Sequence, residues 1–134
     1  MDARQIPADD GDPPALLNAG TYSAIYIAHR GMMAFRTPKL EMQFRLFEHP
    51  DIVLSRWYRV TGYKNRISAP IQSDLVREIQ AALNRRIRLD RIPLELLKDK
   101  PVIVDVKVVT IDKTQHELAP VNRYNVIERI RGPA

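Results

Sequence analysis

The clearest strand in this chain is residues 40–46, which read LEMQFRL. Large apolar residues occupy every second position, and glutamate, glutamine and arginine occupy the positions between them. This period of two is typical of a β-strand that buries one face against a core and leaves the other face open. The open face of the strand therefore carries Gln43 and Arg45, followed by Phe47 where the strand ends.

Four further strands are predicted around this one. Aromatic and β-branched residues or alternating valines mark each of them, as strands prefer. They are residues 20–29, residues 52–60 with Trp57 and Tyr58, residues 101–112, and residues 123–131. Residues 30–39 contain Gly31 and Pro38 and are expected to form a loop.

One helix is predicted between the third and fourth strands. Apolar residues fall at helical spacing over residues 73–84, Ser73 is a suitable N-cap, and Asp74 suits the positive end of the helix dipole. A shorter helical turn is expected from Pro93 to Leu97. The order of three strands, a helix and two strands is that of the oligonucleotide-binding (OB) fold. The fold class is therefore predicted to be mainly β, an OB-fold-like five-stranded Greek-key barrel with one α-helix between strands 3 and 4.

The chain has 134 residues and no cysteine, which predicts one domain without disulfides, thiol chemistry or a zinc ribbon. Its charge is unevenly distributed. Residues 1–13 hold four acidic residues and one basic residue, whereas the rest of the chain holds 20 basic and 12 acidic residues. We interpret residues 1–17 as a flexible, acidic and proline-rich tail and residues 18–134 as a single OB-fold-like domain. A basic domain favours a polyanionic partner such as nucleic acid.

Several function classes are disfavoured by the sequence. No apolar stretch reaches the roughly 20 residues of a membrane span, and the first residues lack the pattern of a signal peptide, so we expect a cytoplasmic protein with no membrane partner. His29, His49 and His116 lie in separate segments, and neither a His-Glu-x-x-His nor a Gly-x-Ser-x-Gly spacing is present. We therefore expect no enzymatic activity, no catalytic residues, no bound metal and no cofactor.

Binding of a single-stranded nucleic acid requires cations for the phosphates and flat side chains on which bases stack. The sequence offers both kinds of side chain in the segment 30–39, on the second and third strands, and in the basic loop before the helix. The candidate nucleic-acid-binding residues are Arg30, Phe35, Arg36, Lys39, Arg45, Phe47, Trp57, Arg59, Tyr63, Lys64 and Arg66.

Two of these assignments have alternatives that the sequence leaves open. Trp57 and Arg59 share one face of their strand, whereas Arg56 and Tyr58 share the other face. The pattern does not decide which face meets the partner, and Trp57 is a core residue if its face is the inner one. Phe35 either stacks on a base or plugs the end of the barrel.

The chain resembles small OB-fold proteins of bacteriophages and other mobile elements that are similar to single-stranded-DNA-binding proteins. The resemblance covers residues 18–131 and rests on the segments 20–22, 39–47, 56–58, 73–84, 96–102 and 123–126. It implies a role in replication, recombination or transfer of phage or mobile-element DNA. With the candidate residues above, we expect a non-catalytic protein that binds single-stranded DNA with little sequence preference through phosphates and stacking. A homo-oligomer is expected because many OB-fold binders work as multimers. The chain departs from many such proteins because it ends in Gly132, Pro133 and Ala134 without an acidic tip.

Two other partners stay open at this level. RNA is an alternative to DNA, because the contact that distinguishes them is made to the 2′-hydroxyl. The second alternative is a protein-interaction or assembly subunit of a mobile-element or secretion complex that binds no nucleic acid, in which Met32 and Met33 would suit an adaptable protein contact. The arginines of residues 84–91 are interpreted as a solvated charge run.

Overall fold

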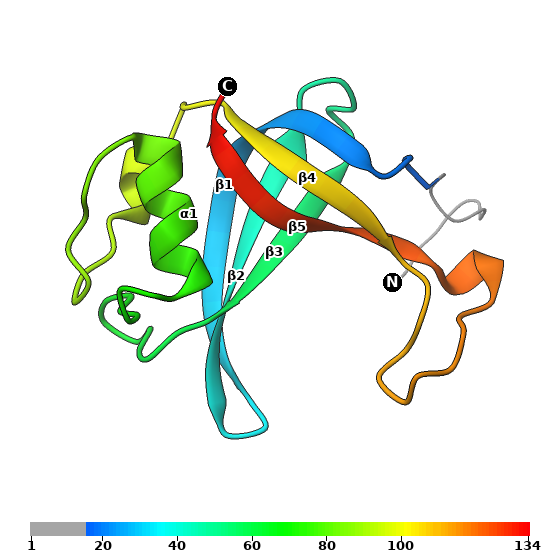
Figure 1. The fold of residues 1–134 in the computed structure, drawn as a ribbon, viewed down its shortest axis with the longest axis horizontal. Helices are drawn as coiled ribbons and strands as arrows, with labels where there is room; N and C mark the ends of the chain where they lie inside the picture. The colour runs from blue at the N-terminus through cyan, green and yellow to red at the C-terminus, as the bar shows by residue number, and fades with distance from the viewer. Residues whose placement is uncertain (1–15) are drawn as a thin grey trace.

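The structure is a computed structural model, and it describes residues 16–134. Five antiparallel strands form one sheet in the order β3-β2-β1-β4-β5, with a single α-helix between β3 and β4 (Figure 1). Apart from Leu16 and Leu17, the predicted tail lies outside the described residues. The elements are β1 (Gly20–Ala34), β2 (Thr37–Leu46), β3 (Val53–Arg59), α1 (Asp74–Leu83), the 3-10 turn η2 (Leu94–Leu97), β4 (Val102–Val109), the 3-10 turn η3 (Pro120–Asn122) and β5 (Tyr124–Pro133).

The core lies on one side of this sheet and follows the predicted alternation. Leu40, Met42, Phe44 and Leu46 of β2 are fully buried. The apolar stripe of α1 is also buried, and the helix starts as predicted, because the Ser73 side chain caps it by accepting a hydrogen bond from the backbone N–H of Val76 at 3.3 Å. The strands and the helix are therefore held together by one continuous apolar cluster.

The prediction of a loop over residues 30–39 is wrong. These residues extend β1 and β2 into a long hairpin in which only Phe35 and Arg36 form the turn (Figure 1). Gly31 lies within β1 opposite Leu40, and the ring of Tyr63 packs against its backbone, where a Cβ atom would collide with the ring. Glycine at residue 31 thus marks a close approach of another segment and not the start of a loop.

The sheet differs from the predicted barrel because it is open. Over residues 16–134, no backbone ladder joins the two edge strands β3 and β5. Glu78 of α1 connects them instead. Its buried Oε1 accepts hydrogen bonds from Tyr58 Oη of β3 and from the backbone N–H of Ile130 of β5, both at 2.8 Å, and Arg56 Nη2 donates to its Oε2 at 2.6 Å. A side chain of the helix thus takes the place of backbone hydrogen bonds at the seam.

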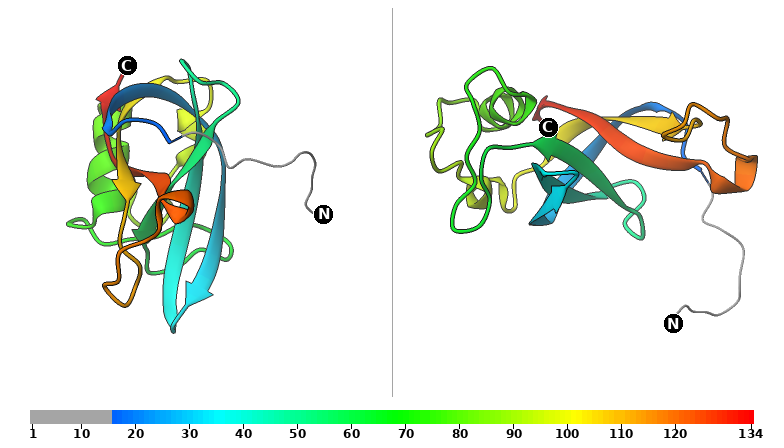
Figure 2. Two further views of the ribbon diagram at one scale, coloured as in Figure 1. Left: turned by 90° about the vertical axis from the view of Figure 1, so that its right-hand side faces the viewer. Right: turned by 90° about the horizontal axis from the view of Figure 1, so that it is seen from below.

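Two arms project from the sheet. One is the β1–β2 hairpin, and the other is the β4–β5 loop, residues 110–123, which includes η3 (Figures 1 and 2). Among residues 16–134, no helix is long and apolar enough to cross a bilayer.

Candidate nucleic-acid interface

The structure decides which face of β3 is turned outward. Leu40 lies opposite Tyr58 on the core side, whereas Glu41 lies opposite Trp57 and Lys39 opposite Arg59 on the other side. Tyr58 is 3% exposed and Trp57 is 37% exposed. Trp57 is therefore a surface residue. We call this surface the open face, and its polar and aromatic members are Arg30, Lys39, Glu41, Gln43, Arg45, Ser55, Trp57 and Arg59.

A hydrogen-bonded cluster holds a cation beside Trp57. The guanidinium carbon of Arg30 lies 5.9 Å from the centroid of the indole ring, and Arg30 Nε donates to Glu41 Oε1 at 2.5 Å. Ser55 Oγ donates to the second carboxylate oxygen of Glu41, also at 2.5 Å. The cluster thus presents a flat ring and a positive charge side by side, as stacking on a base next to a phosphate requires.

Glu41 is the one acidic residue among the open-face members, and its carboxylate forms a salt bridge with Arg30 of the same face. Burial by itself would raise the pKa of Glu41, but the hydrogen bonds from Ser55 and Arg30 outweigh burial and hold the pKa below its ordinary value. The carboxylate therefore stays ionised and positions Arg30. Sequence reasoning missed Glu41 and Ser55, because the signal that links them is the cross-strand register and not the spacing along the chain.

The tip of the hairpin presents an aromatic ring and a cation to solvent. Phe35 is 88% exposed, so it does not plug the end of a barrel. Phe35 and Arg36 have positive φ angles of 51° and 63°. Two-residue hairpin turns with positive φ at both positions favour asparagine and glycine, and other side chains cost about 1–3 kcal/mol each there. The turn geometry therefore does not account for a phenylalanine and an arginine at this tip.

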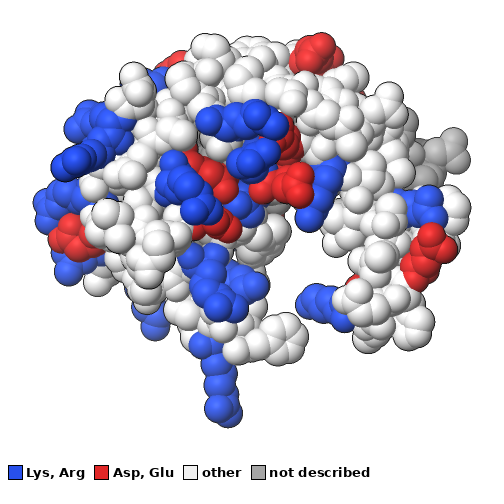
Figure 3. Space-filling model, viewed as in Figure 1, with Lys and Arg blue, Asp and Glu red and all other residues white. Residues whose placement is uncertain are grey.

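The two arms approach each other at their ends. Lys113 Nζ of the β4–β5 loop lies 5.2 Å from the centroid of the Phe35 ring. In the space-filling view, a hollow separates the hairpin from the β4–β5 loop (Figure 3). Lys113 is a candidate binding residue that sequence reasoning missed, because 78 positions separate it from Phe35 along the chain.

The remaining candidates lie at other places. Tyr63, Lys64 and Arg66 line an open depression of about 390 Å³ next to the hairpin. The ring of Tyr63 is partly buried against Gly31, so Tyr63 braces the hairpin and offers only part of its ring for stacking. Phe47 is half exposed and follows the end of β2 that lies far from the hairpin tip.

The structure thus divides the predicted site into three groups. The open face holds five of the predicted residues, with Phe47 just beyond its end, the hairpin tip holds two, and the loop of residues 61–68 holds three. In chain order, the open-face residues are Arg30, Lys39, Arg45, Trp57 and Arg59, the tip residues are Phe35 and Arg36, and the loop residues are Tyr63, Lys64 and Arg66.

The charges on these groups differ from those on the surface formed by α1, β4 and β5. There, acidic and basic side chains alternate and form ion pairs, such as those that Asp105 makes with Arg129 at 2.9 Å and with Arg131 at 2.7 Å (Figure 3). By contrast, within residues 16–134 no carboxylate forms a salt bridge with Lys39, Arg45 or Arg59. Among the described residues, the open face therefore leaves these three cations without a carboxylate partner, as an anionic ligand would require.

The part of the chain that the structure describes contains no group of three or more histidine, aspartate or glutamate side chains that could hold a metal ion. No known protein-family model matches this chain, and no curated protein matches its sequence.

Proposed function

We propose that this protein binds single-stranded DNA with little sequence preference and without catalysis, and that its open face receives the strand. The observation that carries the proposal is the 37% exposed Trp57 with the Arg30 guanidinium 5.9 Å from its ring centroid, on a face whose Lys39, Arg45 and Arg59 form no salt bridge with a carboxylate of residues 16–134. A base stacked on such a ring contributes about 1–3 kcal/mol whatever its identity, because every base has a flat face. The neighbouring lysine and arginines suit phosphates, which are the same in every sequence.

The position of the face within the fold supports this reading. In OB folds, the second and third strands and the loops β1–β2 and β4–β5 form the binding surface. The open face here lies mainly on β2 and β3, with Arg30 added from β1, and Phe35 and Lys113 come from the two corresponding connections. We therefore propose an OB-fold-like barrel whose seam between β3 and β5 is bridged by Glu78. A role in replication, recombination or transfer of mobile DNA is proposed from the resemblance in sequence pattern, and a homo-oligomer is proposed because many OB-fold binders work as multimers.

The direct test is a titration of oligo-thymidine into the full-length protein, followed by the fluorescence of Trp57, the single tryptophan of the chain. We expect quenching that weakens as salt rises, with a slope of log K against log salt of about −0.7 for each phosphate neutralised. Duplex DNA of the same length is expected to quench less, and oligo-uridine shows whether RNA competes. If neither oligo-thymidine nor duplex DNA nor oligo-uridine binds at low salt, the proposal is refuted and the protein-interaction alternative is favoured.

A pair of variants tests the role of the ring. Trp57→Ala is expected to weaken binding of a labelled oligo-thymidine by about 5- to 150-fold, which corresponds to the loss of one stacked base. Tyr124→Ala is the matched control, because Tyr124 is a half-exposed aromatic residue of β5 outside the three groups. Fluorescence anisotropy of the labelled strand measures both affinities. Equal effects of the two substitutions would contradict binding at the open face.

A further inference from the structure

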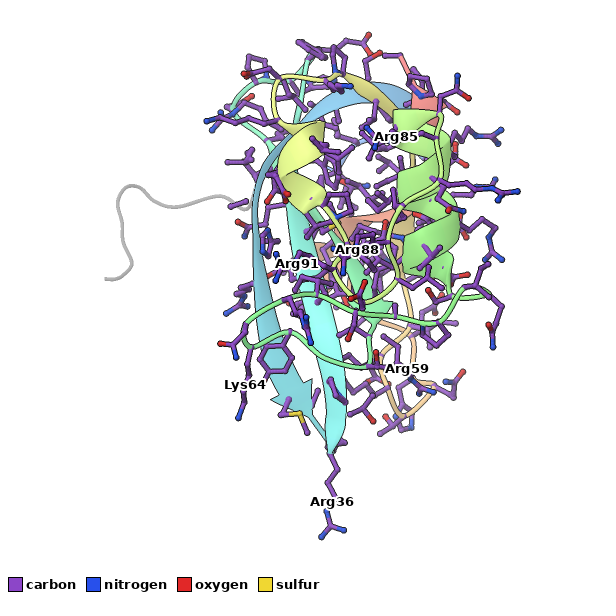
Figure 4. The ribbon with its side chains drawn as sticks, turned by 90° about the vertical axis from the view of Figure 1, so that its left-hand side faces the viewer. Arg36, Arg59, Lys64, Arg85, Arg88 and Arg91 are labelled. Atoms are coloured by element: carbon purple, nitrogen blue, oxygen red, sulfur yellow. The ribbon has the colours of Figure 1, made fainter. Side chains whose placement is uncertain are left out.

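A second basic surface lies beside the hairpin, on the side of the molecule that Figure 4 shows. It is formed by the loop of residues 61–68 and by the connection of residues 84–91 that follows α1. We call it the basic end surface. Its cations are Lys64, Arg66, Arg85, Arg86, Arg88 and Arg91.

Backbone hydrogen bonds fix the two segments against each other. The N–H of Ile92 donates to the carbonyl of Ile67 at 2.8 Å, and the N–H of Ala69 donates to the carbonyl of Leu89 at 3.2 Å. The connection is also held to the helix, because the N–H of Ile87 donates to the side-chain oxygen of Gln80 at 3.3 Å. The cations of the basic end surface therefore project from an ordered backbone packed on the core.

Most of these cations have no carboxylate partner within residues 16–134. Only Arg88 forms a salt bridge, with Asp90 at 2.7 Å. The hydrogen bonds from Arg88 hold the pKa of Asp90 below its ordinary value, and the charge of Arg66 in the neighbouring loop adds to this effect. The two segments thus present one field of positive charge, in which a single acidic residue is already neutralised.

The basic end surface adjoins the open face along the chain that follows β3. Arg59 of the open face is the last residue of β3, and two residues later the chain enters the depression that Lys64 and Arg66 line. Figure 4 shows Arg36, Arg59 and Lys64 below Arg88 and Arg91 on this side of the molecule. Cations therefore continue from the sheet, past the hairpin, to the connection after the helix.

We infer that a single strand bound on the open face continues through this depression onto the basic end surface. This inference rests on the proposed function and extends its footprint beyond the sheet. The ligand on the end surface is the phosphodiester backbone of the same strand, because residues 84–91 contain arginines and no aromatic residue on which a base could stack.

The test compares oligo-thymidines of about 8 and about 30 nucleotides, since one OB fold covers about 4–16 nucleotides. The variant is Arg85→Ala, Arg86→Ala and Arg91→Ala combined, because no carboxylate of the described residues pairs with these arginines. We expect it to bind the short strand within about twofold of the wild type but the long strand at least about tenfold more weakly, with a salt slope reduced by about 2, or about 0.7 for each lost phosphate contact.

Two controls separate the path of the strand from general charge and from folding. Lys98→Ala, Lys100→Ala and Lys107→Ala combined remove the same charge from exposed residues of other segments and are expected to leave long-strand binding within about threefold. Arg85→Lys, Arg86→Lys and Arg91→Lys combined keep the charge and are expected to retain the binding. Thermal unfolding followed by circular dichroism confirms that each variant is folded.

The outcomes distinguish this inference from the function on which it rests. Wild-type affinity of the triple alanine variant for the long strand overturns the extended path and leaves binding at the open face intact. Equal losses for both strand lengths, or for both sets of alanine substitutions, overturn it as well, because they indicate general charge. Failure of the wild-type protein to bind either strand overturns the proposed function itself.

Discussion

Replacing the hairpin tip by Phe35→Asn and Arg36→Gly is expected to strengthen the fold and weaken the binding. Both residues have positive φ angles, a conformation that asparagine and glycine adopt at little cost. If other side chains cost about 1–3 kcal/mol at each such position, the substitution relieves about 2 kcal/mol or more of strain. The loss of the exposed contact between Phe35 and Lys113 removes about 0.5–1 kcal/mol. The unfolding free energy should therefore rise by about 1 kcal/mol or more.

The same substitution should reduce affinity for a single strand. It removes a ring that is 88% exposed and one cation at the end of the hairpin. Loss of one stacked base is expected to weaken oligo-thymidine binding by about 5- to 150-fold, and loss of one phosphate contact should reduce the salt slope by about 0.7.

Urea unfolding followed by circular dichroism and anisotropy of a labelled oligo-thymidine measure the two effects on the same protein preparations. Phe35→Leu is the matched control, because it keeps an apolar side chain at positive φ but removes the aromatic ring. The reasoning is refuted if the double variant unfolds at lower urea concentration than the wild type. It is equally refuted if the double variant binds the strand as tightly as the wild type.

Three further predictions concern the framework of the site and are read from denaturation curves. Glu78→Ala should lower the unfolding free energy by about 3–5 kcal/mol, because the partly buried cation of Arg56 and two buried donors lose their acceptor, and a loss below about 1 kcal/mol would contradict the bridge between β3 and β5. Gly31→Ala should cost about 1–3 kcal/mol because the new methyl group displaces the Tyr63 ring, whereas combining it with Tyr63→Ala should recover part of the loss. Burial by itself would raise the pKa of Asp105, but hydrogen bonds from two arginines and a threonine outweigh burial and lower this pKa. The ionised Asp105 carboxylate therefore contributes its full stabilisation above the unfolded-state pKa of about 3.9, and this contribution is lost as pH falls further. The stability difference between wild type and Asp105→Asn should therefore shrink below about pH 4, and a constant difference would count against this assignment.

Much of the secondary structure could be predicted from local pattern. The alternation in residues 40–46 predicted the strand and its buried face, and Ser73 predicted where the helix begins. These signals are local because strand and helix periodicity depend only on neighbouring positions along the chain. The hairpin could not be predicted in this way. Gly31 and Pro38 are typical of loops, and the packing that explains a glycine at residue 31 comes from Tyr63, in a distant segment.

The members of the candidate site could be proposed from residue type, but their grouping could not. Alternation placed Trp57 and Arg59 on the same face of β3, yet only the pairing of β2 with β3 shows that this face is the outer one. The link between Arg30, Glu41 and Ser55 depends on the register of three strands. The approach of Lys113 to Phe35 joins two connections that are far apart along the chain.

The sequence by itself determined that this is a mainly β chain with one capped helix between the third and fourth strands, and that its charge beyond the first residues is basic. The net charge is a sum over residues, and the strands and the helix produce patterns between neighbouring residues, so both properties can be predicted without knowing the tertiary contacts. Only the tertiary structure decided that the sheet stays open at the seam that Glu78 bridges, that Trp57 is exposed, and which cations lack a carboxylate partner among residues 16–134. These properties depend on contacts between residues distant in sequence, and such contacts exist only once the chain has folded.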